Sequence, residues 1–257
     1  MWEWGAFYER HVGESSLLYD SGSLCQTRNF IREIVFKPDN FVTPVHLRCV
    51  ILSYSVQVVC MANKDIIVIG ASFGGVEALK MLVSGLPKGF HASVFLVQHR
   101  TSHAPSLLPE ILMKAGPLPA SSPADFEPIE QGHIYVAPPG YHMILEQGLV
   151  RLIHGPKENR ARPAIDALFR SAAYAYGLRV VGVVLTGLLK DGTAGLWAVK
   201  DRGGTAIVQD PEGAIAPSMP QSALQNVAVD YCLPLGEIAP LLAQLASTPT
   251  SRLFCDP

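Results

Sequence analysis

The chain has 257 residues, of which 49% are hydrophobic and 16% are charged, as in a globular protein with a sizeable core. Its formal net charge is −2, whereas nucleic-acid-binding proteins usually have a basic surface, so no nucleic-acid partner is expected. The five cysteines include no CxxC pair, which argues against a zinc site and a disulfide framework. No apolar segment is long enough for membrane insertion. We therefore expect a cytoplasmic protein.

The sequence changes character near residue 62. Residues 1–62 mix tryptophans, scattered charges and three cysteines without a sustained helical period. The segment 61–65 resembles the natural start of a protein, so we expect an irregular N-terminal extension that precedes the true start or is poorly ordered. The alternative is a genuine small appendage, in which residues 50–60 form an added strand. A regular domain is expected over 63–248, with a short tail at 249–257.

From residue 64 apolar strands alternate with amphipathic helices. Strand-length apolar runs predict strands at 66–69, 93–97, 133–137, 180–185 and 205–208. Apolar residues at helical spacing predict helices at 75–86, 106–114, 163–176, 193–200, 222–226 and 237–246. Two short segments, 143–145 and 150–153, predict a β-hairpin. This alternation is typical of an α/β fold, here a doubly wound, mostly parallel sheet with helices on both faces and a small antiparallel hairpin insertion.

The turn after the first strand carries one hydroxyl group. The sequence GASFGG occupies residues 70–75, between strand 66–69 and the first helix. Its glycines let the backbone bend sharply and leave the side chain of Ser72 exposed at the carboxyl end of the strand. A serine there, beside a helix N-terminus, is placed to act as a nucleophile or to help bind an anion. The simpler alternative is that Ser72 only caps the helix.

Two more polar residues follow predicted strands. His99 comes after strand 93–97, and Asp191 lies in the turn after strand 180–185. In open parallel sheets, sites form beyond the carboxyl ends of the strands. A histidine can accept the proton of a serine, and a carboxylate can orient the histidine, so Ser72, His99 and Asp191 are candidates for a catalytic triad. Against this, His99 is one of eight histidines, and Asp191 competes with Asp166, Asp201 and Asp210. Asp191 could also be only a helix N-cap.

Chain order and motif chemistry disfavour two other classes of protein. An α/β-hydrolase places its histidine last, after the acid, whereas the last histidine here is His154. A dinucleotide site needs a glycine where Ser72 stands and an acidic residue where His99 stands.

From about residue 64 to 246 the chain resembles the catalytic domain of the chemotaxis protein-glutamate methylesterases (CheB-type). The segments that carry the resemblance are IGASFGG at 69–75, VQH at 97–99, GHIYVAPPGYH at 132–142, RPAIDALFRSAA at 162–173, LTG at 185–187, KDG at 190–192, GGT at 203–205 and MP at 219–220. The resemblance implies a Ser-His-Asp triad, with Ser72 as nucleophile, His99 as general base and then acid, and Asp191 as the orienting acid. Backbone N–H groups around 73–75 would help to hold the oxyanion.

The resemblance also implies a reaction and a partner. The reaction is hydrolysis of glutamate 5-O-methyl esters on methyl-accepting chemotaxis receptors, which releases methanol, with glutamine deamidation as a side activity. The partners would be the cytoplasmic helices of methylated chemoreceptors. No cofactor and no metal ion are implied.

The chain departs from the family pattern at several positions. Phe73 replaces a small residue or threonine, Leu188-Leu189 replaces Met-Gly, and Ala161 replaces a histidine. The first sixty residues also lack the acidic pair of a phosphoreceiver domain, so no phosphorylation-controlled gate is expected. Two alternatives stay open: a catalytically weak adaptor of a chemosensory array, and a general small-ester hydrolase.

Overall fold

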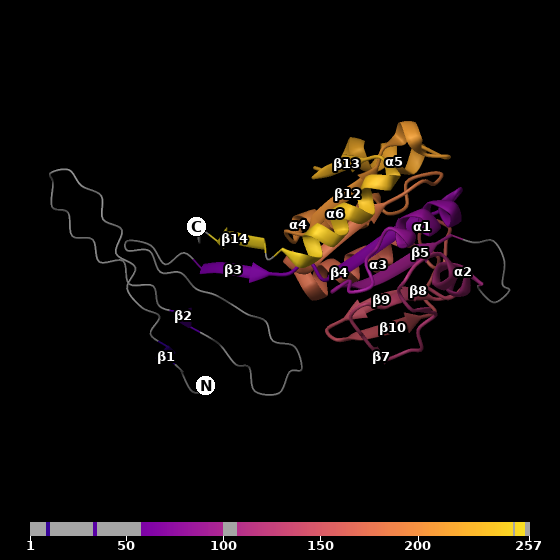
Figure 1. Ribbon diagram of the computed structural model, residues 1–257. Coiled ribbons are helices and arrows are strands. Elements are labelled where there is room, and N and C mark those ends of the chain that lie inside the picture. The colour runs from indigo at the N-terminus through magenta and orange to yellow at the C-terminus, as the bar shows by residue number, and fades with distance from the viewer. Residues whose placement is uncertain (1–8, 11–32, 35–57, 100–106, 249, 255–257) are drawn as a thin grey trace. The chain divides into compact units, whose positions relative to one another are not determined.

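The computed structural model describes residues 9–10, 33–34, 58–99, 107–248 and 250–254 (Figure 1). The chain divides into one compact unit over Asn63–Thr248 and another that combines Met1–Ala62 with Pro249–Pro257. In the latter, β1 (Glu9–Arg10) pairs with β2 (Glu33–Ile34), and β3 (Val58–Ala62) pairs with β14 (Thr250–Phe254), both antiparallel. Most of the alternative strand at 50–60, and most of the proposed N-terminal extension, lies outside the described residues.

A seven-stranded sheet forms the centre of the larger unit. Its strands, in spatial order, are β13 (Tyr231–Leu233), β12 (Thr205–Gln209), β11 (Val180–Val184), β4 (Ile66–Ala71), β5 (Ser93–Gln98), β8 (Ile134–Val136) and β6 (Ala120–Ser121). Every neighbouring pair is parallel. The expected parallel sheet is thereby confirmed, with β6 and β13 as two short strands that the sequence did not predict.

Helices cover both faces of this sheet, as expected. One face packs against α1 (Gly75–Ser84), α2 (Leu108–Ala115) and α6 (Leu235–Ser247), and the other against α3 (Ile165–Tyr176), α4 (Thr193–Asp201) and α5 (Ser218–Asn226). Successive side chains of a strand point to opposite faces, so Ile67 and Ile69 join the first core while Ile66 and Val68 join the second. Because both faces are buried, β4 is an uninterrupted apolar run rather than an alternating one.

A small antiparallel sheet accompanies the parallel one. The predicted hairpin consists of β9 (His142–Glu146) and β10 (Leu149–Ile153), joined by a turn in which Gly148 has a φ of 77°. A third strand, β7 (Glu127–Pro128), pairs with β10 and was not predicted. Two 3-10 helices, at Gly177–Arg179 and Pro211–Gly213, complete the described secondary structure. Within the described residues, no helix combines the length and apolar character needed to span a bilayer.

The strand order places a crevice beside β4. The chain passes from β4 to β5 on one side and later returns to β11 on the other side of β4. At such a switch point the connections leave the two strands in opposite directions, so a crevice forms beyond their carboxyl ends. The turn containing Ser72 and the loop containing Asp191 both lie at this edge.

Candidate active site

The turn after β4 holds Ser72 between two strand ends. Its backbone N–H donates to the carbonyl oxygen of Thr186, which follows β11, at 3.0 Å, and its own carbonyl accepts from Gly75 N at 2.9 Å. Gly74 has a φ of 75°, and a Cβ atom there would lie 2.8 Å from Cβ of Ile215. The turn therefore requires glycine for both its backbone conformation and its close packing. Ser72 makes no capping hydrogen bond to α1, whose N-cap is Gly74.

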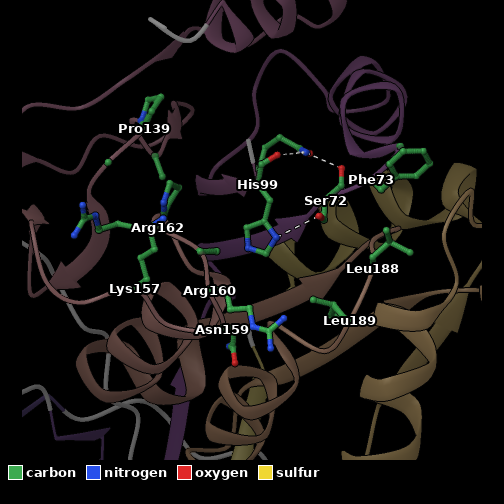
Figure 2. Close-up of a pocket in the computed structure, with 16 residues that line it drawn as sticks. Ser72, Phe73, His99, Pro139, Lys157, Asn159, Arg160, Arg162, Leu188 and Leu189 are labelled. Carbon is green, nitrogen blue, oxygen red and sulfur yellow. Dashed lines mark hydrogen bonds between the residues drawn. The ribbon is translucent and has the colours of Figure 1, made fainter. Parts of the chain in front are cut away.

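His99 lies directly beyond β5 and faces both other candidates. Its Nδ1 is 3.2 Å from Oγ of Ser72, and its Nε2 is 2.7 Å from Oδ2 of Asp191 (Figure 2 shows the first contact). With its proton on Nε2, the ring donates to Asp191 and presents the lone pair of Nδ1 to the serine hydroxyl. The structure thus brings together the three residues that the sequence placed at the ends of three strands.

Asp191 is 2% exposed, and donors surround its carboxylate. Besides His99, these donors are Nδ2 of Asn159 at 2.7 Å and the backbone N–H groups of Ile165 at 2.8 Å, Asp166 at 3.1 Å and Gly192 at 3.0 Å. Ile165 and Asp166 are the first helical residues of α3. The carboxylate of Asp191 therefore caps the N-terminus of α3, although Asp191 itself lies just before α4 in the chain. Burial raises the pKa of Asp191, but hydrogen bonds from His99 and from these two backbone groups outweigh it and hold the pKa below its ordinary value of 3.8.

This lowered pKa predicts how the stability of the fold depends on pH. The carboxylate of Asp191 stabilises the folded state at every pH above about 4, and this contribution is lost as the pH falls through its folded pKa. We expect Asp191→Asn to lower the free energy of unfolding by about 1–3 kcal/mol near pH 7, and the difference from wild type to shrink below about pH 4. Urea unfolding curves across this range test it, with the exposed Asp201→Asn as control. A difference that stays constant down to about pH 3 would contradict it.

A second buried carboxylate, Asp166, lies next to Asp191. It accepts hydrogen bonds from Gly192 N at 3.0 Å, Gly195 N at 2.6 Å and Nδ2 of Asn159 at 2.7 Å. Burial raises the pKa of Asp166, and the neighbouring Asp191 raises it further. The amide of Asn159 donates to both carboxylates and so bridges them in a fixed arrangement. In the sequence analysis Asp166 appears only as an alternative to Asp191. No sequence pattern indicated that Asn159 would contact these carboxylates.

Gln98 joins the backbones of Ser72 and His99 through its side-chain amide. Its Nε2 donates to the carbonyl oxygen of Ser72 at 2.7 Å and to that of His99 at 3.0 Å. Its Oε1 is buried without a partner among the described residues and lies against Gly75, where an added Cβ would collide with it. The amide of Gln98 thus holds the backbones on either side of the serine–histidine contact.

Replacing Gln98 by leucine is expected to lower activity without unfolding the protein. Leucine has a similar size but cannot donate to either carbonyl, so the separation of Ser72 and His99 is no longer held. Misplacement by about 1 Å can cost on the order of 100-fold in rate. The measurement is kcat for hydrolysis of p-nitrophenyl acetate, with the melting temperature recorded in parallel. An unchanged kcat would show that the two hydrogen bonds do not position the site.

The candidate residues open into a pocket of about 830 Å³. Ser72 and His99 line it. Three cationic residues, Lys157, Arg160 and Arg162, also line it, as do the large apolar side chains of Phe73, Leu188 and Leu189. The three departures from the family pattern noted above, at Phe73, Leu188-Leu189 and Ala161, all line this pocket. These residues therefore change the surface of the pocket rather than the hydrogen bonds among Ser72, His99 and Asp191.

Most of the chain is similar to known proteins. The family model described as CheB methylesterase matches residues 67–242. A protein of Leptospira interrogans, named as a protein-glutamate methylesterase/protein-glutamine glutaminase, is 39% identical over 184 residues, which are 71% of this chain and 95% of that protein. A similarly named protein of Anaeromyxobacter dehalogenans is 37% identical over 72% of this chain, but the match spans only 54% of that protein. The crystal structure of the Thermotoga maritima CheB methylesterase catalytic domain matches with a TM-score of 0.66 at 36% identity, over 70% of this chain and 98% of that one.

Proposed function

The chain belongs to the CheB methylesterase family, and from this we propose that it hydrolyses glutamate 5-O-methyl esters on methyl-accepting chemotaxis receptors. The observation that carries the proposal is the chain of hydrogen bonds from Ser72 through His99 to Asp191, in which Ser72 and His99 line the pocket. The products would be a glutamate side chain and methanol. The names of the relatives support glutamine deamidation as a side activity of the same site.

In the first half of the proposed reaction, Nδ1 of His99 takes the proton of Ser72 as Oγ attacks the ester carbonyl. Asp191 stabilises the imidazolium that forms and keeps the ring oriented through Nε2. When the tetrahedral intermediate collapses, the same Nδ1 gives its proton to the leaving methoxide, and methanol departs. An acyl-enzyme on Ser72 remains.

Water then attacks the acyl-enzyme, with His99 again as the base, and releases the glutamate carboxylate and free Ser72. The negative oxygen of each intermediate needs donors close to Ser72. Of the backbone groups expected for this role, the N–H of Gly75 is already donated to the carbonyl of Ser72. Within the described residues, the N–H groups of Phe73 and Gly74 have no acceptor, and they lie at the N-terminus of α1. We assign the oxyanion to these two donors.

The proposed partners are the cytoplasmic helices of methylated chemoreceptors, and the reaction would take place in the cytoplasm. The test is methanol release from methylated cytoplasmic receptor fragments. If the protein turned over p-nitrophenyl acetate but released no methanol, a general small-ester hydrolase would replace the proposal. If it did neither, and a fluorophosphonate probe failed to label Ser72, a chemosensory adaptor would replace it.

A further inference from the structure

The pocket around Ser72 carries a strong excess of positive charge. Its lining includes Lys157, Arg160 and Arg162 but no aspartate and no glutamate. The chain as a whole has 22 acidic residues against 20 lysines and arginines, so the pocket does not simply reflect the composition. The methyl ester is neutral, the oxyanion of the proposed reaction is assigned to two backbone N–H groups, and His99 protonates the leaving methoxide, so none of these three steps requires a cation in the pocket.

Two of these cations are available to a ligand. Arg162 donates through Nη1 to the carbonyl of Gly155 at 2.6 Å and so has a structural partner. Lys157 and Arg160 are exposed, and within the described part of the chain neither pairs with a carboxylate. The adjacent acid, Glu158, is occupied by Arg170 at 2.7 Å. Some cations elsewhere have acidic partners, namely Lys80, Arg151, Arg170, Arg179, Lys200 and Arg202.

Arg160 is presented by a turn that is fixed in position. Glu158 and Ala161 exchange backbone hydrogen bonds of 3.1 and 2.8 Å, and the two residues between them have positive φ angles of 49° at Asn159 and 64° at Arg160. The side chain of Asn159 then ties the turn to Asp166 and Asp191. Strained backbone of this kind concentrates at binding sites, and a fixed turn lowers the entropic cost of engaging a ligand.

The other side of the pocket is apolar. Phe73, Leu188 and Leu189 are 61%, 54% and 67% exposed, and Leu189 also has a positive φ, of 67°. In Figure 2, Ser72 and His99 lie between Lys157 on one side and Phe73 and Leu188 on the other. A partner that fits both sides presents an acidic surface and an apolar surface flanking the group that enters the pocket.

We propose that Lys157 and Arg160 select the substrate by binding carboxylates that lie within about one helical turn of the esterified glutamate, while Phe73, Leu188 and Leu189 contact the apolar flank of the same helix. The inference rests on the proposed function and names the chemistry of the helix that the site accepts: amphipathic, with free acidic side chains beside the ester. Residues three and four positions apart share a helix face, so such carboxylates reach the rim when the ester reaches Ser72.

The test exchanges charges between enzyme and substrate. Two methylated receptor fragments serve as probes: one with its native acidic residues, and one with those within a turn of the ester changed to lysine. With Arg160→Glu, kcat/KM on the native fragment is expected to fall about tenfold, mainly through KM. On the lysine fragment Arg160→Glu is expected to outperform the wild type, which a purely structural role of Arg160 would not produce.

Matched variants and salt complete the design. Lys88→Glu makes the same change of charge at an exposed residue outside the pocket and should behave as wild type on both fragments. Arg160→Asn removes the charge with a residue that tolerates positive φ, and it should give an intermediate loss. At about 1 M salt, where charges are screened beyond about 3 Å, the variants should converge.

Each outcome decides a different claim. If the wild type releases methanol and Arg160→Glu changes kcat/KM by the same factor on both fragments, Arg160 does not bind substrate carboxylates. The proposed esterase function is then unaffected. If the wild type releases methanol from neither fragment, the proposed function fails, and this inference fails with it.

Discussion

Replacing Ser72 by alanine is expected to reduce methanol release from methylated receptor fragments by about three to six orders of magnitude. The loss follows from the geometry: among the residues that the structure describes, only the hydroxyl of Ser72 lies against Nδ1 of His99, with Oγ 3.2 Å away. Without a nucleophile no acyl-enzyme forms, and what remains is the catalysis that the donors and the pocket give to direct attack by water. The measurement is methanol formed per enzyme under initial-rate conditions.

The matched control for this variant is Ser84→Ala. Ser84 is an exposed serine at the end of α1 that donates to the carbonyl of Met81 and is not among the residues that line the pocket. It should leave the rate within twofold of wild type, since surface changes of this kind have small effects. A Ser72→Ala protein that kept more than about one per cent of the activity would rule out covalent catalysis by this serine.

Replacing Asp191 by asparagine is expected to lower kcat by about 10⁴-fold while the protein still folds. The nearly isosteric amide can keep the contact with His99, but its NH₂ group then donates to Nε2. The ring proton moves to Nδ1, and Nδ1 faces Ser72. A protonated Nδ1 cannot accept the serine proton, so the general base is lost through the tautomer rather than through displacement of the ring.

Two measurements separate this explanation from simple unfolding. The rate at which a fluorophosphonate probe labels Ser72 should fall together with kcat, whereas the far-UV circular dichroism spectrum should be retained. Asp201→Asn makes the same chemical change at an exposed position of α4 and should match wild type in both. A loss in kcat of less than tenfold for Asp191→Asn would contradict the role of Asp191 as the orienting acid.

The residues at which the sequence is expected to depart from the family pattern line the pocket. The side chains of Phe73, Leu188 and Leu189 are exposed and make none of the hydrogen bonds that join Ser72, His99 and Asp191. The backbone donors assigned to the oxyanion do not depend on the identity of these side chains. We therefore expect these departures to change which helix binds, and how tightly, more than the chemical step.

The elements that could be predicted are those with a local cause. The strand at β4 and the helix at α1 follow from an apolar run and from 3.6-residue spacing, which depend only on neighbouring residues. The strands β6 and β13 were missed because each is only two or three residues long, which is too short to show a strand pattern in the sequence. The helix α3 begins two residues later than predicted, at Ile165, where its first N–H groups donate to Asp191 from a distant segment.

The sequence by itself determined the class of fold and the edge of the sheet at which Ser72, His99 and Asp191 would meet, because in a parallel sheet all carboxyl ends lie on one side. Their catalytic roles stay predictions. Only the tertiary structure decided which nitrogen of His99 faces which partner, that Asn159 joins Asp166 to Asp191, and that Gln98 links the backbones of Ser72 and His99. It also decided that the free cations and the exposed apolar side chains flank one pocket. These contacts join residues far apart in the chain, and their geometry depends on side-chain packing, which no local pattern encodes.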